Sequence, residues 1–257
     1  TAVISASAYT NESDWLVTET SSFQLETTNE FHPVVSAILN LTPDHLNRHH
    51  TMEGYGAAKA KVFANQTEDE YLIINRDDEL CYALAEGCRA KVVPFSRRRE
   101  LDFGAYIKDG VIVICDEAGV QHEICRTCDI RIIGDHNLEN VLAAAAICYF
   151  AGISEDVICE GIKAFGGVEH RIEFCRELDG VKYYNDSKGT NTDASITAIK
   201  ALAENIILIA GGDSKGQDFD EFVKYFDPGV KEVILLGRDA HFIEEAAKKA
   251  GYTNMVY

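Results

Sequence analysis

Short apolar runs alternate with longer amphipathic stretches along the first part of the chain. Short runs are typical of buried strands, and apolar residues that recur every three or four positions are typical of helices. The expected strands lie at 15–18, 34–41, 71–75 and 91–95. The expected helices lie at 52–64 and 77–86, the second beginning with an Asp cap. Strands that alternate with helices in this way predict an α/β fold.

The pattern changes between residues 104 and 131. Asp109-Gly110 separates the apolar runs 106–108 and 111–114, and Asp-Gly between apolar runs is a strong signal for a β-hairpin. Residues 130–133 predict one more strand. We therefore expect a small antiparallel patch on one edge of a mostly parallel sheet.

Two helices are expected next, at 137–151 and at 154–165, with Ser154 as the cap of the second. Gly166-Gly167 then interrupts the pattern, and we place a domain boundary there. This boundary gives a first domain at 1–167 and a second at 168–257. We expect the first domain to carry the mostly parallel, nucleotide-binding sheet.

Beyond the two glycines the alternation of strands and helices resumes. Strands are expected near 182 and at 206–210, 232–236 and 254–257, and helices are expected from 192, 219 and 240. This order of elements predicts a Rossmann-like parallel sheet covered by helices.

Composition narrows the class of protein. The chain has 257 residues, of which 46% are hydrophobic, so it can bury a sizeable core. No apolar run approaches the roughly 20 residues that span a bilayer, and the first residues lack a signal-peptide layout. The formal charge of −18 argues against nucleic acid as a partner. We expect a cytoplasmic protein without a membrane partner.

The eight cysteines do not form a zinc-binding pattern. Cys125 and Cys128 make a single CxxC, His122 is close, and a fourth ligand is not evident. Cys148 and Cys159 fall in apolar helical stretches and are expected in the core. Scattered cysteines fit a reducing compartment.

The candidate chemistry is concentrated in residues 184–191, between an expected strand and an expected helix. Asp186 and Lys188 lie two residues apart there, so one can orient a ligand while the other holds an anion. Ligands of open α/β sheets bind outside the carboxyl ends of the strands. The alternative is a polar loop with a helix cap.

Further strings accompany this segment along the chain, and together they resemble the Mur ligases. They are Glu-Thr-Ser-Ser-Phe-Gln-Leu-Glu (19–26), Leu-Thr-Pro-Asp-His (41–45), Ala-Ala-Lys (57–59), Gly-Asp-His-Asn (134–137), Glu-His-Arg-Ile-Glu (169–173), Asn-Asp-Ser-Lys-Gly-Thr-Asn (185–191) and Gly-Gly-Asp-Ser-Lys-Gly (211–216). The resemblance covers nearly the whole chain. The strings at 21–26 and 185–191 are those of the branch that uses D-glutamate.

The resemblance implies a metal site in the first domain. It makes Glu19 and His45 ligands of Mg²⁺, with two ions expected, and it makes Lys59 a carbamate that helps to hold them. Ser21 would support the phosphate or metal region. Without the resemblance, Glu19 could be a solvated acid at a strand end, and His45 a structural histidine.

Several alternatives stay open around these residues. Lys61 competes with Lys59, although residues two apart on a helix point about 200° away from each other. His49 and His50 are expected at the surface. Asn47 stands where the family usually has an acid.

The resemblance also implies nucleotide and substrate contacts. Asn137 would bind adenine, although His136-Asn137 could be only an N-cap. Arg171 would reach the phosphates and Asp186 the ribose. Lys188 would lie near the phosphate and the incoming amino acid, whose carboxylate Thr190 and Lys215 would bind. Lys59, Lys188 and His45 are the residues expected to act in catalysis.

The function implied is an ATP-dependent ligation in peptidoglycan precursor synthesis. UDP-N-acetylmuramoyl-L-alanine and D-glutamate would be the substrates, ATP and Mg²⁺ the cofactors, and the protein would be monomeric. The family's phosphate loop and sugar-nucleotide domain are not in this sequence, since 212–216 lacks the phosphate-loop spacing. We therefore expect a fragment, truncated at both ends and inactive alone. A sister Mur or folylpolyglutamate-type ligase and a non-catalytic nucleotide-binding module are the alternatives.

Overall fold

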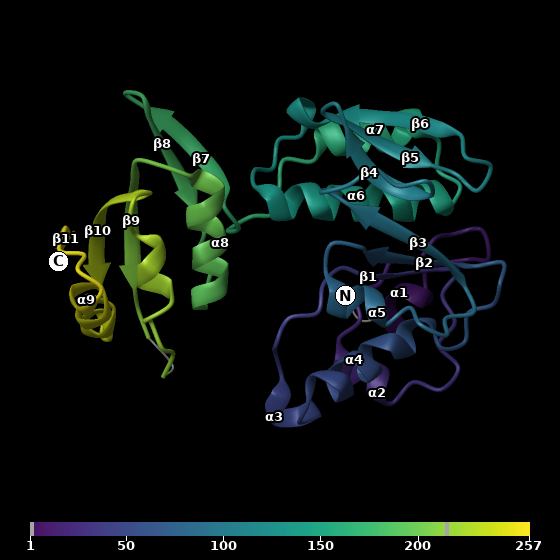
Figure 1. Ribbon diagram of the computed structural model, residues 1–257, viewed down its shortest axis with the longest axis horizontal. Coiled ribbons are helices and arrows are strands. Elements are labelled where there is room, and N and C mark those ends of the chain that lie inside the picture. Colours follow the sequence, from purple (N-terminus) through teal and green to yellow (C-terminus); the bar gives the residue numbers. More distant parts are fainter. Residues whose placement is uncertain (1–2, 214–215) are drawn as a thin grey trace. The chain divides into compact units, whose positions relative to one another are not determined.

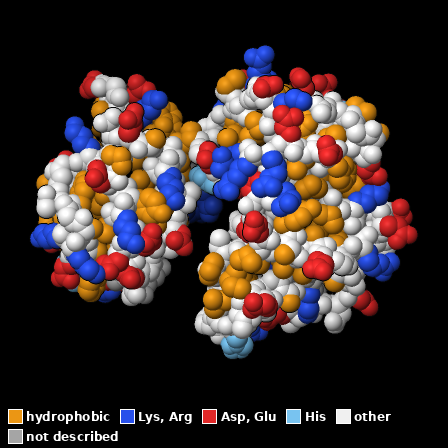
Figure 2. Space-filling model, in the orientation of Figure 1, with side chains coloured by type: hydrophobic (Ala, Val, Ile, Leu, Met, Phe, Trp, Pro, Cys, Tyr) orange, Lys and Arg blue, Asp and Glu red, His pale blue; other side chains and the backbone are white. Residues whose placement is uncertain are grey.

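The computed structural model describes residues 3–213 and 216–257 (Figure 1). Its internal contacts group the chain into two compact units. Unit 1 comprises Thr1–Ile107, Ile114–His122 and Ala143–Ile153, and unit 2 comprises Lys108–Val113, Glu123–Leu142 and Ser154–Tyr257. Asp and Glu side chains are interspersed with Lys and Arg on the face that Figure 2 shows. None of the helices described is both long and apolar enough to cross a bilayer.

The main sheet follows the chain order, β1-β2-β3-β4-β5-β6. The strands are β1 (Val35–Ile38), β2 (Tyr71–Asn75), β3 (Lys91–Ser96), β4 (Gly104–Lys108), β5 (Val111–Cys115) and β6 (Gln121–Arg126). The pairs from β1 to β4 are parallel. Asp109 and Gly110 turn from β4 into β5 with φ of 48° and 75°, the left-handed pair that a two-residue hairpin requires. The predicted α/β class and the hairpin at this turn are confirmed.

The core of unit 1 lies around β2. Leu72, Ile73 and Ile74 are fully buried, because apolar groups cover both faces of the strand. Three short helices that pack there begin at a side-chain cap: Ser21, Thr51 and Asp78 each accept a hydrogen bond from a backbone N–H of the first turn. The helices of the first half are α1 (Val3–Ser7), α2 (Ser22–Glu26), α3 (Leu46–His49), α4 (Met52–Ala60), η1 (Lys61–Phe63), α5 (Glu79–Ala83), η2 (Thr127–Asp129), α6 (Asp135–Phe150) and α7 (Glu155–Ala164).

Two strands predicted in this half are wrong. Residues 15–18 are described and form no strand, and Trp15 and Val17 are 55% and 90% exposed. Residues 130–133 also form no strand, because the chain first turns through η2, where the Ile130 N–H donates to the Thr127 carbonyl. The hairpin is followed instead by β6 at Gln121–Arg126.

The second half begins with a hairpin that the sequence did not predict. β7 (Glu173–Leu178) pairs antiparallel with β8 (Val181–Asn185). Asp179 and Gly180 make the turn, with φ of 51° and 79°. The strand expected near 182 therefore exists, but its place in the parallel sheet is wrong, because among the described residues it pairs with β7 alone, in a two-stranded sheet.

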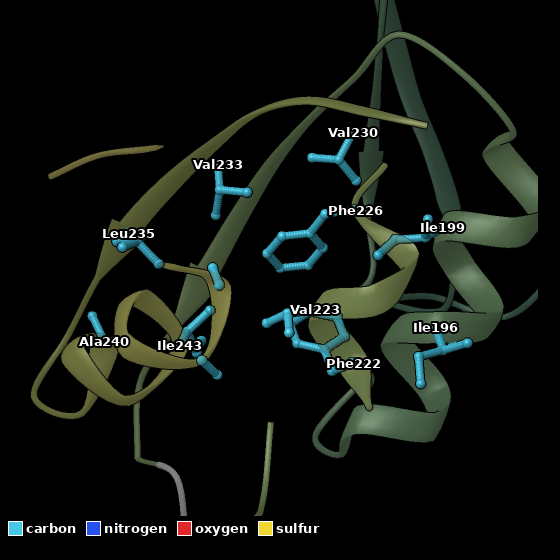
Figure 3. Packing of buried hydrophobic residues seen from close by; sticks show 12 residues of the cluster. Ile196, Ile199, Phe222, Val223, Phe226, Val230, Val233, Leu235, Ala240 and Ile243 are labelled. Carbon is cyan, nitrogen blue, oxygen red and sulfur yellow. The ribbon is translucent and has the colours of Figure 1, made fainter. Parts of the chain in front are cut away.

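The parallel sheet of unit 2 has the order β11-β10-β9. Its strands are β9 (Ile206–Gly211), β10 (Val230–Leu236) and β11 (Met255–Val256), accompanied by α8 (Thr192–Leu202), η3 (Phe222–Tyr225) and α9 (Ala240–Lys249). Figure 3 shows Phe226 at the centre of the core, between Ile199 of α8 and Val233 of β10. Phe226 and Val233 are fully buried. The helix expected from 219 is only the short turn η3.

Two glycines allow the ends of β9 and β10 to touch through their backbones. A Cβ on Gly211, which has φ of 147°, would lie 1.7 Å from the carbonyl oxygen of Leu236. A Cβ on Gly237 would lie 2.7 Å from the backbone nitrogen of Gly212. No other residue type fits this approach without moving a strand.

Candidate functional site

Glu19 and Ser21 lie at the start of α2. Glu19 is exposed and follows a segment that is not a strand, so its predicted place at a strand end is wrong. Ser21 is the N-cap of α2: its Oγ accepts from the Gln24 N–H at 3.2 Å, while the Gln24 Oε1 accepts from the Ser21 N–H at 2.8 Å. This reciprocal pair occupies the Ser21 hydroxyl with the cap.

His45 lies beside two aromatic rings. It precedes α3 in the left-handed conformation with φ of 53°, and its Nε2 is 3.4 Å from the Asp44 carboxylate. Its ring centroid is 4.8 Å from that of Phe23 and 6.3 Å from that of Tyr55. The exposed imidazole is therefore held against α2 and α4 by ring contacts.

Lys59 and Lys61 have different surroundings at the end of α4. The Lys59 Nζ lies 5.0 Å from the centre of the Tyr55 ring. The Lys61 Nζ donates instead to the backbone carbonyl of Glu26 at 2.5 Å. Lys59 and His45 thus contact the same ring, that of Tyr55. The hydrogen bond of Lys61 instead connects the end of α4 to the end of α2.

His49 is buried, which corrects the expectation that it lies at the surface. It is 8% exposed, and its Nε2 is 3.0 Å from the Ser22 Oγ. Its Nδ1 is 3.2 Å from the Glu26 Oε1, and the Arg48 guanidinium binds the same carboxylate at 2.8 Å. The hydrogen bond from Arg48 lowers the pKa of Glu26, and the charge of His49 acts in the same direction. His50 is exposed, as expected.

The metal site implied by the sequence is only partly assembled. His45 and Lys59 both contact Tyr55, while among the described residues no ion pair or hydrogen bond joins Glu19 to either. Within 3–213 and 216–257, no group of three or more His, Cys, Asp or Glu could hold a metal ion. As an ammonium group Lys59 repels a cation, and only its carbamate would offer oxygen ligands. These donors do not form a complete metal site as they stand.

Asn137 lies inside the first turn of α6, so the alternative that His136-Asn137 is an N-cap is wrong. α6 begins at Asp135. The Asn137 Nδ2 donates to the Ile133 carbonyl at 2.7 Å, and its Oδ1 accepts from Asn140 at 3.3 Å. The side-chain amide therefore anchors the chain that enters the helix.

His136, beside Asn137, feels the charges of two predicted site residues. Burial lowers the pKa of His136, and the positive charge of Arg171 lowers it further. The negative charge of Asp186 acts in the opposite direction. Arg171 and Asp186 are thus within electrostatic range of the start of α6.

Arg171 lies between two residues with left-handed backbones, His170 at φ 68° and Ile172 at φ 44°. The Ile172 N–H donates to the Asp186 Oδ1 at 3.0 Å, and the Lys188 N–H donates to the His170 carbonyl at 2.9 Å. The structure therefore brings the segments that carry Arg171, Asp186 and Lys188 together, through backbone hydrogen bonds.

The loop from Asp186 leads directly into α8. The Asp186 carbonyl accepts from the Gly189 N–H at 2.8 Å, and Asn191 caps α8 by accepting from the Ala194 N–H at 2.8 Å. The cap is therefore Asn191, and the exposed side chains of Lys188 and Thr190 take no part in it.

Gln217, which the sequence analysis did not identify, stabilises the loop before α8 through two hydrogen bonds. Its Nε2 donates to the Thr190 carbonyl at 3.2 Å and its Oε1 accepts from the Thr192 N–H at 3.1 Å. Only its place after the glycine-rich turn of β9 could have drawn attention to it. Lys215, predicted to bind substrate in the same turn, lies outside the described residues.

Two Mur ligase family models match this chain. A model of the Mur ligase middle domain matches residues 3–148, which is more than half of the chain. The chain belongs to the Mur ligase family. A second Mur ligase model, described as the glutamate ligase domain, matches residues 170–257. The family resemblance predicted from the sequence strings is confirmed.

Curated Mur ligase relatives are similar along nearly all of the chain. The UDP-N-acetylmuramoylalanine--D-glutamate ligase of Thermoanaerobacter sp. (strain X514) is 53% identical over 241 residues, which is 94% of this chain and 53% of that protein. The enzyme of the same name from Clostridioides difficile (strain 630) is 47% identical over 98% of this chain and 56% of its own length. The chain spans about half the length of the curated relatives it matches.

Solved Mur ligase structures share the fold. The UDP-N-acetylmuramate-alanine ligase of Thermotoga maritima has a TM-score of 0.63 at 20% identity, over 92% of this chain and 53% of that one. The UDP-N-acetylmuramoylalanyl-D-glutamyl-2,6-diaminopimelate--D-alanyl-D-alanyl ligase of Acinetobacter baumannii has a TM-score of 0.66 at 16% identity, over 87% of this chain and 49% of that one. At these identities the likeness concerns the fold alone, and it confirms the α/β architecture.

Proposed function

We propose that the complete protein containing this chain is an ATP-dependent ligase that joins D-glutamate to UDP-N-acetylmuramoyl-L-alanine. The observation that carries the proposal is the 47–53% identity to enzymes named for that reaction, over 94–98% of the chain. In this proposal the enzyme is cytoplasmic and monomeric, and it serves peptidoglycan precursor synthesis. The domain boundary at Gly166-Gly167 lies between the stretches that match the two family models.

The proposed reaction has two steps. The carboxylate of UDP-N-acetylmuramoyl-L-alanine takes the terminal phosphoryl group of ATP, which releases ADP and leaves an acyl phosphate. The amine of D-glutamate then attacks the acyl carbon, loses a proton and displaces phosphate, so that an amide forms. Neither step needs a covalent bond to the protein, so its residues act by positioning the reactants and neutralising charge.

In the first domain, Glu19, His45 and Lys59 as a carbamate would hold Mg²⁺, and two ions are proposed. The support from the structure is that His45 and Lys59 contact the same ring, Tyr55, while Lys61 is bound to a backbone carbonyl. The ion would neutralise phosphate oxygens. Ser21 is proposed to support this region, although its hydroxyl already serves the cap of α2.

Nucleotide contacts are proposed for Asn137 at the adenine, Arg171 at the phosphates and Asp186 at the ribose. The support is the charge that Arg171 and Asp186 exert on His136, next to Asn137. A guanidinium presents a planar fork of donors that suits phosphate. Because Asn137 already bonds to Ile133, its adenine contact would use the free capacity of the amide.

Substrate contacts are proposed for Lys188, Thr190 and Lys215. The exposed side chains of Lys188 and Thr190 are available, since Asn191 makes the helix cap. A lysine there would stabilise the negative charge that develops during phosphoryl transfer and would help to hold the D-glutamate carboxylate. Lys59, Lys188 and His45 are the proposed catalytic residues.

The test is phosphate release by the complete purified protein. We expect release that requires ATP, Mg²⁺, UDP-N-acetylmuramoyl-L-alanine and D-glutamate together, and that stops when any one is omitted. Turnover with L-alanine, a diamino acid or a folate in place of the two substrates would identify a sister ligase. ATP binding without turnover on any acceptor would identify a non-catalytic nucleotide-binding module.

A further inference from the structure

A polar chain of three residues, of which Ser22 and His49 are buried and Glu26 is half-buried, lies beside the proposed metal site and has no role in the reaction described above. Ser22 and Glu26 are one turn apart on α2, so both face the same side. His49, from the end of α3, fits between them, 3.0 Å from the Ser22 Oγ and 3.2 Å from the Glu26 Oε1. Ser22 and His49 are only 5% and 8% exposed.

The hydrogen bonds fix the orientation of the His49 ring. Arg48 lowers the pKa of Glu26, so this carboxylate is ionised at neutral pH and can only accept. The Nδ1 of His49 therefore carries the hydrogen and donates it to Glu26. Its Nε2 faces the Ser22 hydroxyl, which rotates to complete the second bond. With both nitrogens bound, the imidazole cannot turn without losing a buried hydrogen bond.

The fixed imidazole packs against two aromatic rings. The ring of Phe23 is stacked on His49, with centroids 5.5 Å apart and planes 13° apart. The ring of Tyr55 lies 5.2 Å from His49. The same two rings also contact residues of the proposed metal site. Phe23 and Tyr55 both contact His45, and the Lys59 ammonium lies over the Tyr55 ring. One aromatic ring separates His49 from His45 and from Lys59, two of the three proposed catalytic residues.

We propose that His49 is a positioning residue. Held by Ser22 and Glu26, it sets the places of Phe23 and Tyr55, and through them the places of the His45 imidazole and the Lys59 amine. The catalytic consequence rests on the function proposed above, whereas the positioning itself does not. Exposed side chains such as His45 have few contacts of their own, so this packed support determines where they lie.

The same three residues have the order of a hydrolytic triad, with a hydroxyl, an imidazole and a carboxylate in line. Burial argues against that reading. Ser22 is 5% exposed, and Phe23 stacks on the His49 ring, so a substrate carbonyl has no path to the Ser22 Oγ. A fluorophosphonate probe distinguishes a hydrolytic triad from a positioning role. Labelling of Ser22 in the complete protein would overturn the positioning role.

The main experiment compares variants of the complete protein. His49→Phe keeps a planar ring against Phe23 and Tyr55 but loses both hydrogen bonds. Ser22→Ala removes a single oxygen and is the variant that changes the packing least. His50→Asn changes the exposed neighbouring histidine and is the matched control, since Asn tolerates the φ of 67° found there. Glu26→Gln keeps an acceptor for the His49 Nδ1–H and is the conservative variant, in which the orientation of the His49 ring should be preserved.

The first readout is steady-state kinetics. We expect His49→Phe to lower kcat by about 10–100-fold, because a displacement near 1 Å of a catalytic group can cost about that much. The KM for D-glutamate should change less than about twofold, since the proposed substrate contacts lie on another part of the chain. Ser22→Ala should show a smaller fall in kcat, Glu26→Gln should retain most of it, and His50→Asn should match the wild type. An unchanged kcat in His49→Phe would overturn the proposal.

The second readout does not depend on activity. The ring protons of His45 are shifted by the currents of Phe23 and Tyr55, so His49→Phe and Ser22→Ala should move the His45 resonances in NMR spectra, and His50→Asn should move them less. Unmoved His45 resonances in folded His49→Phe and Ser22→Ala would overturn the positioning role. If the wild type shows no ligase activity but these resonances move, the proposed function fails and the positioning role stands.

Discussion

The carboxylate of Asp186 accepts a hydrogen bond of 3.0 Å from the backbone N–H of Ile172. Ile172 is β-branched and has φ of 44°, a left-handed conformation that costs L-residues about 1–2 kcal/mol. The bond offsets part of this strain at the residue next to Arg171. Asp186 therefore supports the backbone of a second proposed site residue in addition to any contact with a ligand.

Asp186→Ala should lower the free energy of unfolding by about 1–2 kcal/mol, because it removes a charge-assisted hydrogen bond at a half-buried position. Asp186→Asn keeps the Oδ1 acceptor and should cost clearly less. Urea unfolding of both variants measures the difference. Equal losses for the two would show that the bond to Ile172 does not carry the stabilisation.

Lys188→Ala should lower turnover of the complete protein by about 10²–10³-fold, the usual effect of removing one preorganised contact to a developing charge. Its melting temperature should hardly change, since the backbone bond of Lys188 to His170 survives the substitution. Asn191→Ala is the companion variant. It removes the cap of α8 and should cost about 1 kcal/mol of stability. A Lys188→Ala protein with normal turnover would remove Lys188 from the site.

Lys59→Ala should abolish the proposed ligation, and bicarbonate should not restore it, because the amine that would form the proposed carbamate is gone. A short carboxylic acid should restore part of the rate by supplying the missing oxygens. Lys61→Ala should act chiefly on stability, with a loss of about 1–2 kcal/mol from the bond to the Glu26 carbonyl. Turnover and melting curves of both variants show which of the two lysines acts in the reaction and which acts on stability. Near-normal turnover in Lys59→Ala together with inactive Lys61→Ala would reverse the assignment.

Burial and the charge of Arg171 lower the pKa of His136 in the folded protein, so the folded state binds its proton less readily than the unfolded chain does. Stability from this residue is therefore complete above the unfolded pKa of about 6.5 and is lost as pH falls below it. We expect the difference in unfolding free energy between about pH 7.5 and about pH 5.5 to be smaller in His136→Gln than in the wild type. An identical difference in the two proteins would show that His136 does not contribute to the pH dependence of stability.

Gly211→Ala should cost about 3 kcal/mol or more, since its Cβ would lie 1.7 Å from the Leu236 oxygen. Gly212→Ala is a close control: its φ is also positive, at 110°, but a Cβ there meets nothing within 4 Å. The control should cost only about 1–2 kcal/mol for the backbone conformation. Urea midpoints for the pair separate steric contact from strain, and equal losses would rule out the contact.

The two Asp-Gly turns show which hairpins the hydrophobic pattern of the sequence can predict. At 109–110 apolar runs on both sides revealed a hairpin, and the structure has it. At 179–180 the turn has the same residues and the same φ signs, but β7 is exposed along nearly all its length. An exposed strand has no apolar alternation, so hydrophobic periodicity could not reveal it.

In the candidate site, the proximity of some segments could be predicted from the sequence. The sequence strings suggested that Arg171, Asp186 and Lys188 act together, and hydrogen bonds connect the segments that carry them. The burial of His49 could not be predicted, because a histidine beside another histidine gives no local signal. Its partners, Ser22 and Glu26, come from α2 through tertiary packing. The apolar run at 15–18 failed for the opposite reason, since strand-forming residues alone do not supply a neighbouring strand.

The backbone contact between Gly211 and Leu236, with Gly237 beside Gly212, divides this end of the parallel sheet into fixed and variable positions. Randomising the residues that follow β9 and β10 in a directed-evolution library would alter their polar side chains, but any clone that replaced Gly211 or Gly237 would separate β9 from β10. A library that keeps Gly211 and Gly237 and varies the residues between β9 and η3 would therefore contain a much larger share of folded proteins. Mutational work at this end of the sheet is therefore best designed with Gly211 and Gly237 kept.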